Sequence, residues 1–159
     1  MVELTLIYPR KLLSHWKSGN LHKVWSLEHR HLFDAPDLEY LANQHENGYH
    51  FGEWYTAVYF AQRGFDVLVE KYLAHKTHQR KAKVLRSVLK KDGVGLLENC
   101  IEGRGEGPDL FVFDPKQPGF YFFVEVKRED TLKASQQRDI ERIQERICPV
   151  IIVRLQPGN

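Results

Sequence analysis

Cysteine and long apolar runs are both scarce in this sequence. Only two cysteines occur in 159 residues, Cys100 and Cys148, and their wide spacing matches no common metal-binding pattern. We therefore expect reduced and mostly buried thiols, as is usual in the cytoplasm. No run approaches the ~18 apolar residues that a membrane helix requires, and the N-terminus MVELTLIYPRK lacks the long apolar segment of a signal peptide. The sequence thus predicts a soluble, intracellular protein of the cytoplasm.

Repeats and low-complexity linkers are absent as well. A length of 159 residues fits one ordinary domain, which can bury about two-thirds of its unfolded surface without disulfides. Apolar residues make up 42% and charged residues 28%, close to globular averages. We expect residues 49–159 to form the core of the domain and residues 1–48 to be an N-terminal extension of it.

The extension carries the weakest patterns. A strand is predicted over residues 3–8 and helical turns over residues 10–16 and 36–43, before the turn at Asn47-Gly48. Histidines are frequent here, at positions His15, His22, His29, His31 and His45. Their spacing matches no common ligand pattern and no cysteine accompanies them, so surface or core histidines are favoured over a zinc site.

One stretch contains no acidic residue at all. Between Lys71 and Lys91 there are eight lysines and arginines, although the net charge of the whole chain is only +2. A block of one sign favours a polyanionic partner, and we predict contact with nucleic acid; a solvated helix face is the alternative. The residues expected to contact the phosphate backbone are Lys76, Arg80, Lys81, Lys83, Arg86, Lys90, Arg104 and Arg128. For the localisation, a nucleoid-associated or phage-encoded intracellular protein is the alternative to a general cytoplasmic one.

After residue 50 the apolar pattern alternates between helical and strand periods. Helices are predicted over residues 51–63, 77–91 and 131–147, and strands over residues 65–70, 109–113, 120–127 and 150–155. Asp92-Gly93 and Gly95 are expected to end the second helix. The segment 120–127 is the most apolar, which is typical of a strand covered on both faces. The order predicts an α/β domain with a central mixed sheet flanked by helices.

Three charged residues are expected at one end of the hairpin formed by residues 109–113 and 120–127. Side chains alternate along a strand, so Glu125 and Lys127 project from one face with Cα atoms about 6.5 Å apart. Asp109 should lie beside them, because the start of one antiparallel strand neighbours the end of the other. Carboxylates converging beside a lysine favour an Mg²⁺ site; a structural salt bridge is the alternative.

These residues resemble a known family. Gly107-Pro108-Asp109-Leu110, followed after a turn by Val124-Glu125-Val126-Lys127, is similar to the motif of the PD-(D/E)XK nuclease superfamily. Within it, the pattern is most similar to VRR-NUC domains and Holliday junction resolvases. The resemblance implies a restriction-endonuclease-like αβββαβ core over residues 51–155, with residues 71–106 as a basic helical insertion. Pro36-Asp37-Leu38 contains the same Pro-Asp pair but is followed by no ExK strand.

Two further positions fit the resemblance. Family members often carry a glutamate on the first core helix, where Glu53 stands, and a glutamine on the helix after the ExK strand. Gln136 and Gln137 compete for the second role. The apolar stripe of that helix runs through Leu132, Gln136, Ile140, Ile143 and Ile147. Gln136 is therefore expected to face the sheet and Gln137 to face away.

The resemblance implies an Mg²⁺- or Mn²⁺-dependent endodeoxyribonuclease acting on duplex or branched DNA. Asp109, Glu125 and the backbone carbonyl of Val126 would hold the metal, and Glu53 would complete its outer shell or help to hold a second ion. Lys127 would stabilise charge in the transition state, while Gln136 would orient water or phosphate. Resolvases of the superfamily imply a homodimer. The alternatives are cleavage of RNA and a nucleic-acid-binding or accessory protein that keeps the fold without cleaving.

Overall fold

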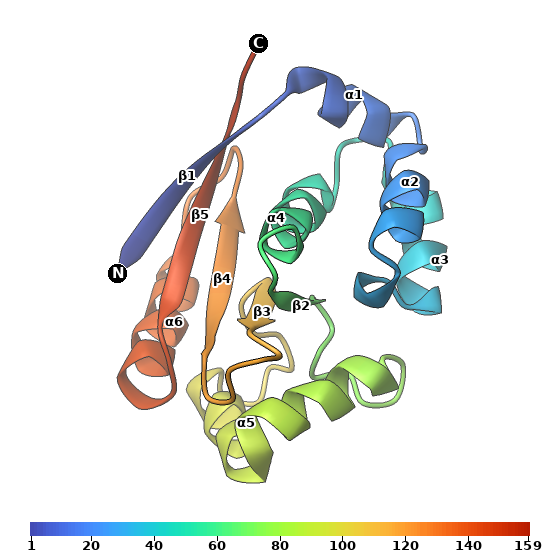
Figure 1. Ribbon diagram of the computed structural model, residues 1–159. Helices are drawn as coiled ribbons and strands as arrows, with labels where there is room; N and C mark the ends of the chain where they lie inside the picture. Colours follow the sequence, from blue (N-terminus) through green and yellow to red (C-terminus); the bar gives the residue numbers. More distant parts are fainter.

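The computed structural model describes residues 1–159 and is built around one five-stranded mixed sheet (Figure 1). The strands are β1 (Val2–Tyr8), β2 (Asp66–Val69), β3 (Leu110–Phe113), β4 (Tyr121–Lys127) and β5 (Val150–Pro157). The helices are α1 (Arg10–Lys17), α2 (Leu21–Glu28), α3 (Ala35–Gln44), α4 (Phe51–Ala61), α5 (Gln79–Cys100) and α6 (Ala134–Arg146), with a 3₁₀ turn at Arg30–Leu32.

The strands lie in the order β1-β5-β4-β3-β2. β2, β3 and β4 pair antiparallel, whereas β4 pairs parallel with β5 and β5 pairs parallel with β1. From α4 onward the elements follow the order expected of a restriction-endonuclease-like core, with α5 inserted between β2 and β3. The predicted α/β fold class is confirmed.

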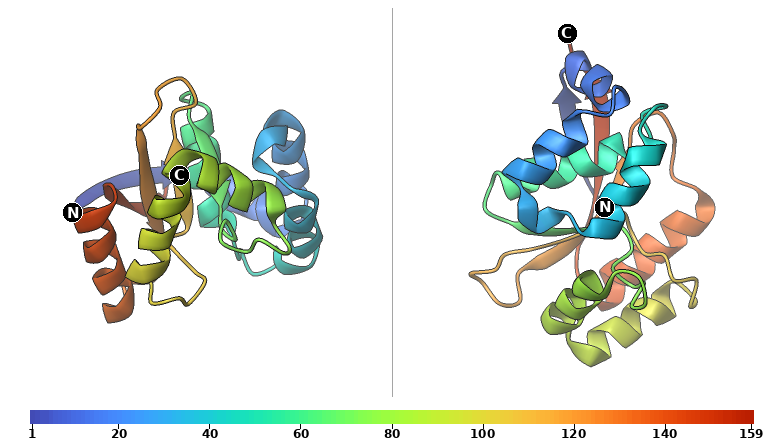
Figure 2. Two further views of the ribbon diagram at one scale, coloured as in Figure 1. Left: turned by 90° about the horizontal axis from the view of Figure 1, so that it is seen from below. Right: turned by 90° about the vertical axis from the view of Figure 1, so that its right-hand side faces the viewer.

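Helices cover both faces of the sheet. Phe122 and Val124 point into a core shared with α4 and the N-terminal helices, whereas Phe111 and Phe123 point into a second core with α5 and α6. Figure 2 shows α6 and the N-terminal helices on opposite sides of the sheet. This double covering explains why β4 is almost continuously apolar.

Two helical predictions for the chain need correction. The helix predicted over residues 77–91 is interrupted at Lys90, where φ is 67° and ψ is 167°, close to its predicted end, but Asp92-Gly93 and Gly95 do not end α5, because a further helical segment runs through them to Cys100. Apolar side chains at helical spacing, among them Leu97 and Cys100, are fully buried, and this burial outweighs the low helix propensity of the glycines. Helix α2 was not predicted, because only Leu21, His22 and Trp25 on its short length are buried.

Gly52 allows α4 to approach the sheet closely. A Cβ atom at this position would lie 3.1 Å from Cδ1 of Leu155 and 3.2 Å from Cγ1 of Val126, tighter than ordinary van der Waals contact. The missing side chain therefore lets the first turn of α4, with Glu53, sit close to the end of β4.

A buried ion pair ties the N-terminal helices to the sheet. The Lys81 side chain is fully buried, and its Nζ donates to Oδ1 of Asp37 at 2.7 Å and to the carbonyl of Val69 at 2.6 Å. Asp37 also accepts a hydrogen bond from the backbone N of Asp34 at 2.8 Å, at the start of α3. The prediction that Lys81 contacts nucleic acid is therefore wrong, because its ammonium group is buried and paired with the Asp37 carboxylate.

Lys81→Ala should lower the free energy of unfolding by about 3–5 kcal/mol, because it leaves the Asp37 carboxylate buried without its partner. Urea denaturation followed by circular dichroism measures this change. Lys83→Ala, at an exposed position of the same helix, is the matched control and should change stability by no more than about 0.5 kcal/mol. Equal effects at the two lysines would contradict the structural role of the pair.

Candidate metal centre

The β3–β4 hairpin brings Asp109 next to the end of β4. Leu110 pairs with Val124 across the antiparallel ladder, so Asp109, one residue earlier, falls opposite Glu125. The Asp109 carboxylate accepts a hydrogen bond from the backbone N of Val126 at 2.8 Å. The backbone before Asp109 is fixed by Tyr72, whose hydroxyl donates a hydrogen bond to the carbonyl of Pro108 at 2.6 Å. Position 107 is a glycine, and a Cβ atom there would clash with this hydroxyl.

Glu125 and Lys127 share a face of β4, as their spacing predicts. Both are only 5% exposed, and Nζ of Lys127 lies 3.4 Å from Oε1 of Glu125. Asp130, in the loop after β4, accepts from the same Nζ at 3.1 Å. The ammonium group is therefore fixed by two carboxylates at the rim of the sheet.

Gln136 joins this group from α6. Its Nε2 donates to Oε1 of Glu125 at 3.1 Å, and its Oε1 accepts from Nζ of Lys127 at 3.2 Å. Gln137 faces away and hydrogen-bonds Glu141 instead. The helical stripe in the sequence thus predicts the orientation of both glutamines correctly.

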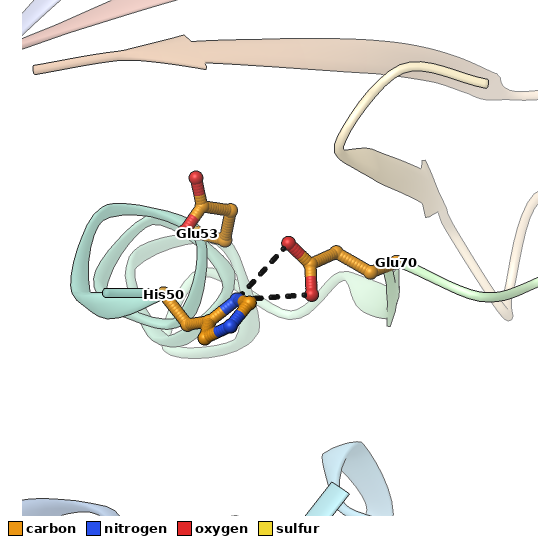
Figure 3. Close-up of side chains that lie close together, drawn as sticks. All are labelled: His50, Glu53 and Glu70. Atoms are coloured by element: carbon orange, nitrogen blue, oxygen red, sulfur yellow. Dashed lines mark hydrogen bonds and ion pairs between the residues drawn. The ribbon is translucent and has the colours of Figure 1, made fainter. Parts of the chain in front are cut away.

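Glu53 belongs to a second group of ligand-type side chains, together with His50 and Glu70 (Figure 3). One donor atom from each lies within 4.8 Å of the other two. His50 precedes α4 and Glu70 directly follows β2. The backbone N of Glu70 donates to the carbonyl of Asp109 at 2.8 Å, which places the second group beside the first.

His50 and Glu70 were missed by the sequence analysis. For Glu70 a signal existed: it is the carboxylate at the end of a predicted strand, and β2 ends where β3 begins. His50 carried no comparable signal, since it stands in a turn and approaches Glu70 only when α4 has packed on the sheet.

Asp109 lies where three hollows in the surface meet. The largest, of about 510 Å³, is lined among others by His50, Glu53, Glu125, Lys127 and Gln136. A second, of about 270 Å³, contains Glu70, and a third, of about 280 Å³, lies against α6. Together they form a polar cleft with the predicted acidic residues at its centre.

Carboxylates in this cleft are shielded from water and repel one another. Burial, with Glu70 nearby, raises the pKa of Glu53 to about 7. Burial, followed by the charges of Glu125 and Glu53, raises the pKa of Asp109 well above its usual range. Burial also raises the pKa of Glu125, although Lys127 opposes the shift. A divalent cation would offset this repulsion, and a set of carboxylate oxygens suits a hard ion such as Mg²⁺.

The basic residues predicted to contact nucleic acid divide into two sets. Arg104 and Arg128 line the cleft, where Arg104 pairs with Asp139. Exposed residues that line none of the three hollows are Lys76, Lys83, Arg86 and Lys90. Arg80 is half-buried and bound to Asp34 at 2.6 Å. Two further basic residues also line the cleft, Lys71 and Lys133.

Comparison with known families agrees with this geometry. The model of the VRR-NUC domain matches residues 50–157, which contain Glu53, the hairpin and α6. The chain belongs to the VRR-NUC domain family. The predicted relationship to the PD-(D/E)XK nucleases is thereby confirmed, and a VRR-NUC domain is a nuclease domain, a hydrolase acting on DNA. No curated protein and no solved structure matches the chain significantly.

The VRR-NUC match leaves residues 1–49 outside it. These residues supply β1, which extends the sheet at β5, and α3, whose Asp37 is bound to Lys81. No helix of the structure combines the length and the apolar character needed to cross a membrane.

Glu53 gives the stability of the metal-free protein a characteristic pH dependence. Its pKa is about 7 in the folded protein, against a usual 4.5, so the folded state binds more protons than the unfolded state between these values. The free energy of unfolding of the metal-free protein therefore falls as the pH rises from about 4.5 to about 7. Glu53→Gln should abolish up to about 3 kcal/mol of this loss. Urea denaturation in EDTA at pH 5 and pH 8 measures it.

Glu39→Gln, at an exposed position of α3, is the matched control and should follow the wild-type pH profile. A Glu53→Gln variant whose stability relative to wild type is the same at both pH values would contradict the crowding of carboxylates in the cleft.

Proposed function

We propose that this VRR-NUC protein is an Mg²⁺- or Mn²⁺-dependent endodeoxyribonuclease that hydrolyses phosphodiester bonds in the cleft around Asp109. The observation that supports this most directly is the meeting of Asp109, Glu125 and Lys127 at neighbouring strand ends. An acidic pair with a fixed ammonium group is chemically suited to bind a cation together with a phosphate.

Asp109, Glu125 and the backbone carbonyl of Val126 would hold the metal, and Glu53 would complete its outer shell or help to hold a second ion. Such an ion, when bound, supplies Lewis acidity toward a phosphoryl oxygen and lowers the pKa of water. The pKa values of Glu53, Asp109 and Glu125 are raised, so protons compete with the cation for these carboxylates. The cation binds once the carboxylates have lost their protons.

Lys127 supplies positive charge to the reacting phosphate. Burial opposes its charged form, but Glu125 and Asp130 outweigh burial and raise the pKa of the ammonium group. Its hydrogen bonds to Asp130 and Gln136 fix its direction. A point charge held in place in this way stabilises a developing phosphorane without reorganisation during the reaction.

Basic residues on two surfaces would hold the DNA. Arg104, Arg128, Lys71 and Lys133 line the cleft and would bind phosphates next to the scissile bond. The exposed lysines and arginines of α5 would bind phosphates farther along the strand. Contacts of this kind position DNA without reading its sequence, which suits a nuclease that recognises duplex or branched structure. By analogy with resolvases, two copies would act together.

Asp109→Asn, Glu125→Gln and Lys127→Ala should each lower the cleavage rate by about 100-fold or more, because each removes metal binding or charge stabilisation. The measurement is cleavage of a labelled panel of single-stranded, duplex, nicked, flap and four-way DNA, and of RNA, with Mg²⁺ or with EDTA. Glu98→Gln, at an exposed position of α5, is the matched control. Cleavage that persists in all three variants would contradict the proposed site.

The same panel separates the alternatives. A protein that binds DNA but cleaves nothing with any divalent ion is a non-cleaving nucleic-acid-binding protein. Cleavage of RNA alone would show that the substrate is not DNA.

Arg104→Ala and Arg128→Ala should each weaken DNA binding and reduce the slope of log K against log salt by about 0.9, one phosphate contact each on duplex DNA. Fluorescence anisotropy in Ca²⁺ from 50 to 300 mM salt measures the slope. Arg63→Ala, at an exposed position where the guanidinium lies over the Tyr59 ring, is the matched control. Slopes equal to wild type in both cleft variants would exclude these arginines from the DNA interface.

A further inference from the structure

The ring of His50 is held between Gln44 and Glu70. Its Nε2 lies 3.1 Å from the side-chain amide of Gln44. Its Nδ1 lies 3.3 Å from one carboxylate oxygen of Glu70 and 3.4 Å from the other. The ring is therefore held with Nδ1 directed at a carboxylate, and the position between them suits either a hydrogen of the ring or a metal ion shared with Glu70.

Glu53 makes a metal ion the better occupant. Donor atoms of His50, Glu53 and Glu70 lie within 4.8 Å of one another, close enough to share one ion. A proton on His50 would serve Glu70 alone, and Figure 3 shows no interaction that joins the Glu53 carboxylate to the other two side chains. A single cation would serve all three.

Helix α3 orients these ligands from outside the VRR-NUC match. Tyr40 donates its hydroxyl to Oε2 of Glu70 at 3.2 Å, and its ring packs edge-on to His50 with centroids 4.9 Å apart. Gln44 lies one turn farther on the same helix face and hydrogen-bonds Nε2 of His50 at 3.1 Å. Asp37, one turn earlier, binds Lys81, which in turn holds the carbonyl of Val69 next to Glu70. Residues that hydrogen-bond metal ligands commonly set metal affinity.

We propose that His50, Glu53 and Glu70 form a second divalent-cation site beside the Asp109 site, and that Tyr40 and Gln44 of the N-terminal extension orient its ligands. An imidazole nitrogen among the donors favours Mn²⁺ over Mg²⁺, in contrast to the all-oxygen set around Asp109 and Glu125. Metal binding here stands on this geometry alone, whereas any part in cleavage rests on the proposed function.

The test is Mn²⁺ titration of the full chain, followed by electron paramagnetic resonance, with electron spin echo detection of ¹⁴N coupling. We expect two bound Mn²⁺ per chain, one of them coupled to imidazole nitrogen. The double variant Asp109→Asn/Glu125→Gln should keep the nitrogen-coupled ion and lose the other. His50→Ala should lose the coupling and keep the other. His75→Ala, at an exposed histidine, should behave as wild type.

Tyr40→Phe should weaken binding of the nitrogen-coupled ion by about 10-fold, since it frees Glu70 from its hydrogen bond. Tyr121→Phe, on β4 at the opposite end from Lys127, is the matched control and should leave the affinity unchanged. Competition with Mg²⁺ should displace the nitrogen-coupled ion less readily than the other.

Absence of ¹⁴N coupling in the wild-type protein would overturn the proposal without any variant, and would assign a proton to Nδ1 of His50. Persistence of the coupling in His50→Ala would place the ion elsewhere. Failure of the nuclease proposal has a different signature: the nitrogen-coupled Mn²⁺ would bind, but none of the nucleic acids would be cleaved.

Discussion

Repulsion between carboxylates at the meeting point of three strands is the constraint on which this structure depends. Asp109 and Glu125 come together because β3 and β4 pair antiparallel, and Glu70 joins them because β2 ends beside Asp109. The pKa of Asp109 is raised by burial and by the charges of Glu125, Glu53 and Glu70. Without a counter-ion such a group destabilises the fold, which is typical of functional sites.

The rest of the molecule holds these groups in place. Two apolar cores pack against the two faces of the sheet and support the strands that carry these groups. Gly52 lets α4 carry Glu53 close to β4. The buried pair of Asp37 and Lys81 connects α3 with α5 and with the end of β2. The N-terminal extension, although outside the VRR-NUC match, thereby adjoins the cleft.

Much of the site could be predicted because its geometry follows from local periodicity. The period of two along β4 places Glu125 and Lys127 on one face, and the helical period of α6 separates Gln136 from Gln137. The position of Asp109 required only a hairpin and its register. The fold class followed from the order of helices and strands.

What could not be predicted depends on contacts between segments far apart in the chain. Lys81 belongs to a basic block, yet its partner Asp37 lies 44 residues earlier, on an element whose packing no local pattern reveals. His50 approaches Glu70 only through the placement of α4, and Tyr40 only through that of α3. The continuation of α5 beyond Lys90 depends on burial that outweighs two glycines.

We propose above all that the Asp109 and Glu125 carboxylates share a divalent cation. Anomalous X-ray diffraction from crystals grown with Mn²⁺ tests it most directly. We predict an anomalous peak within coordination distance of both carboxylates. A well-ordered crystal with both side chains in place and no peak between them would contradict it.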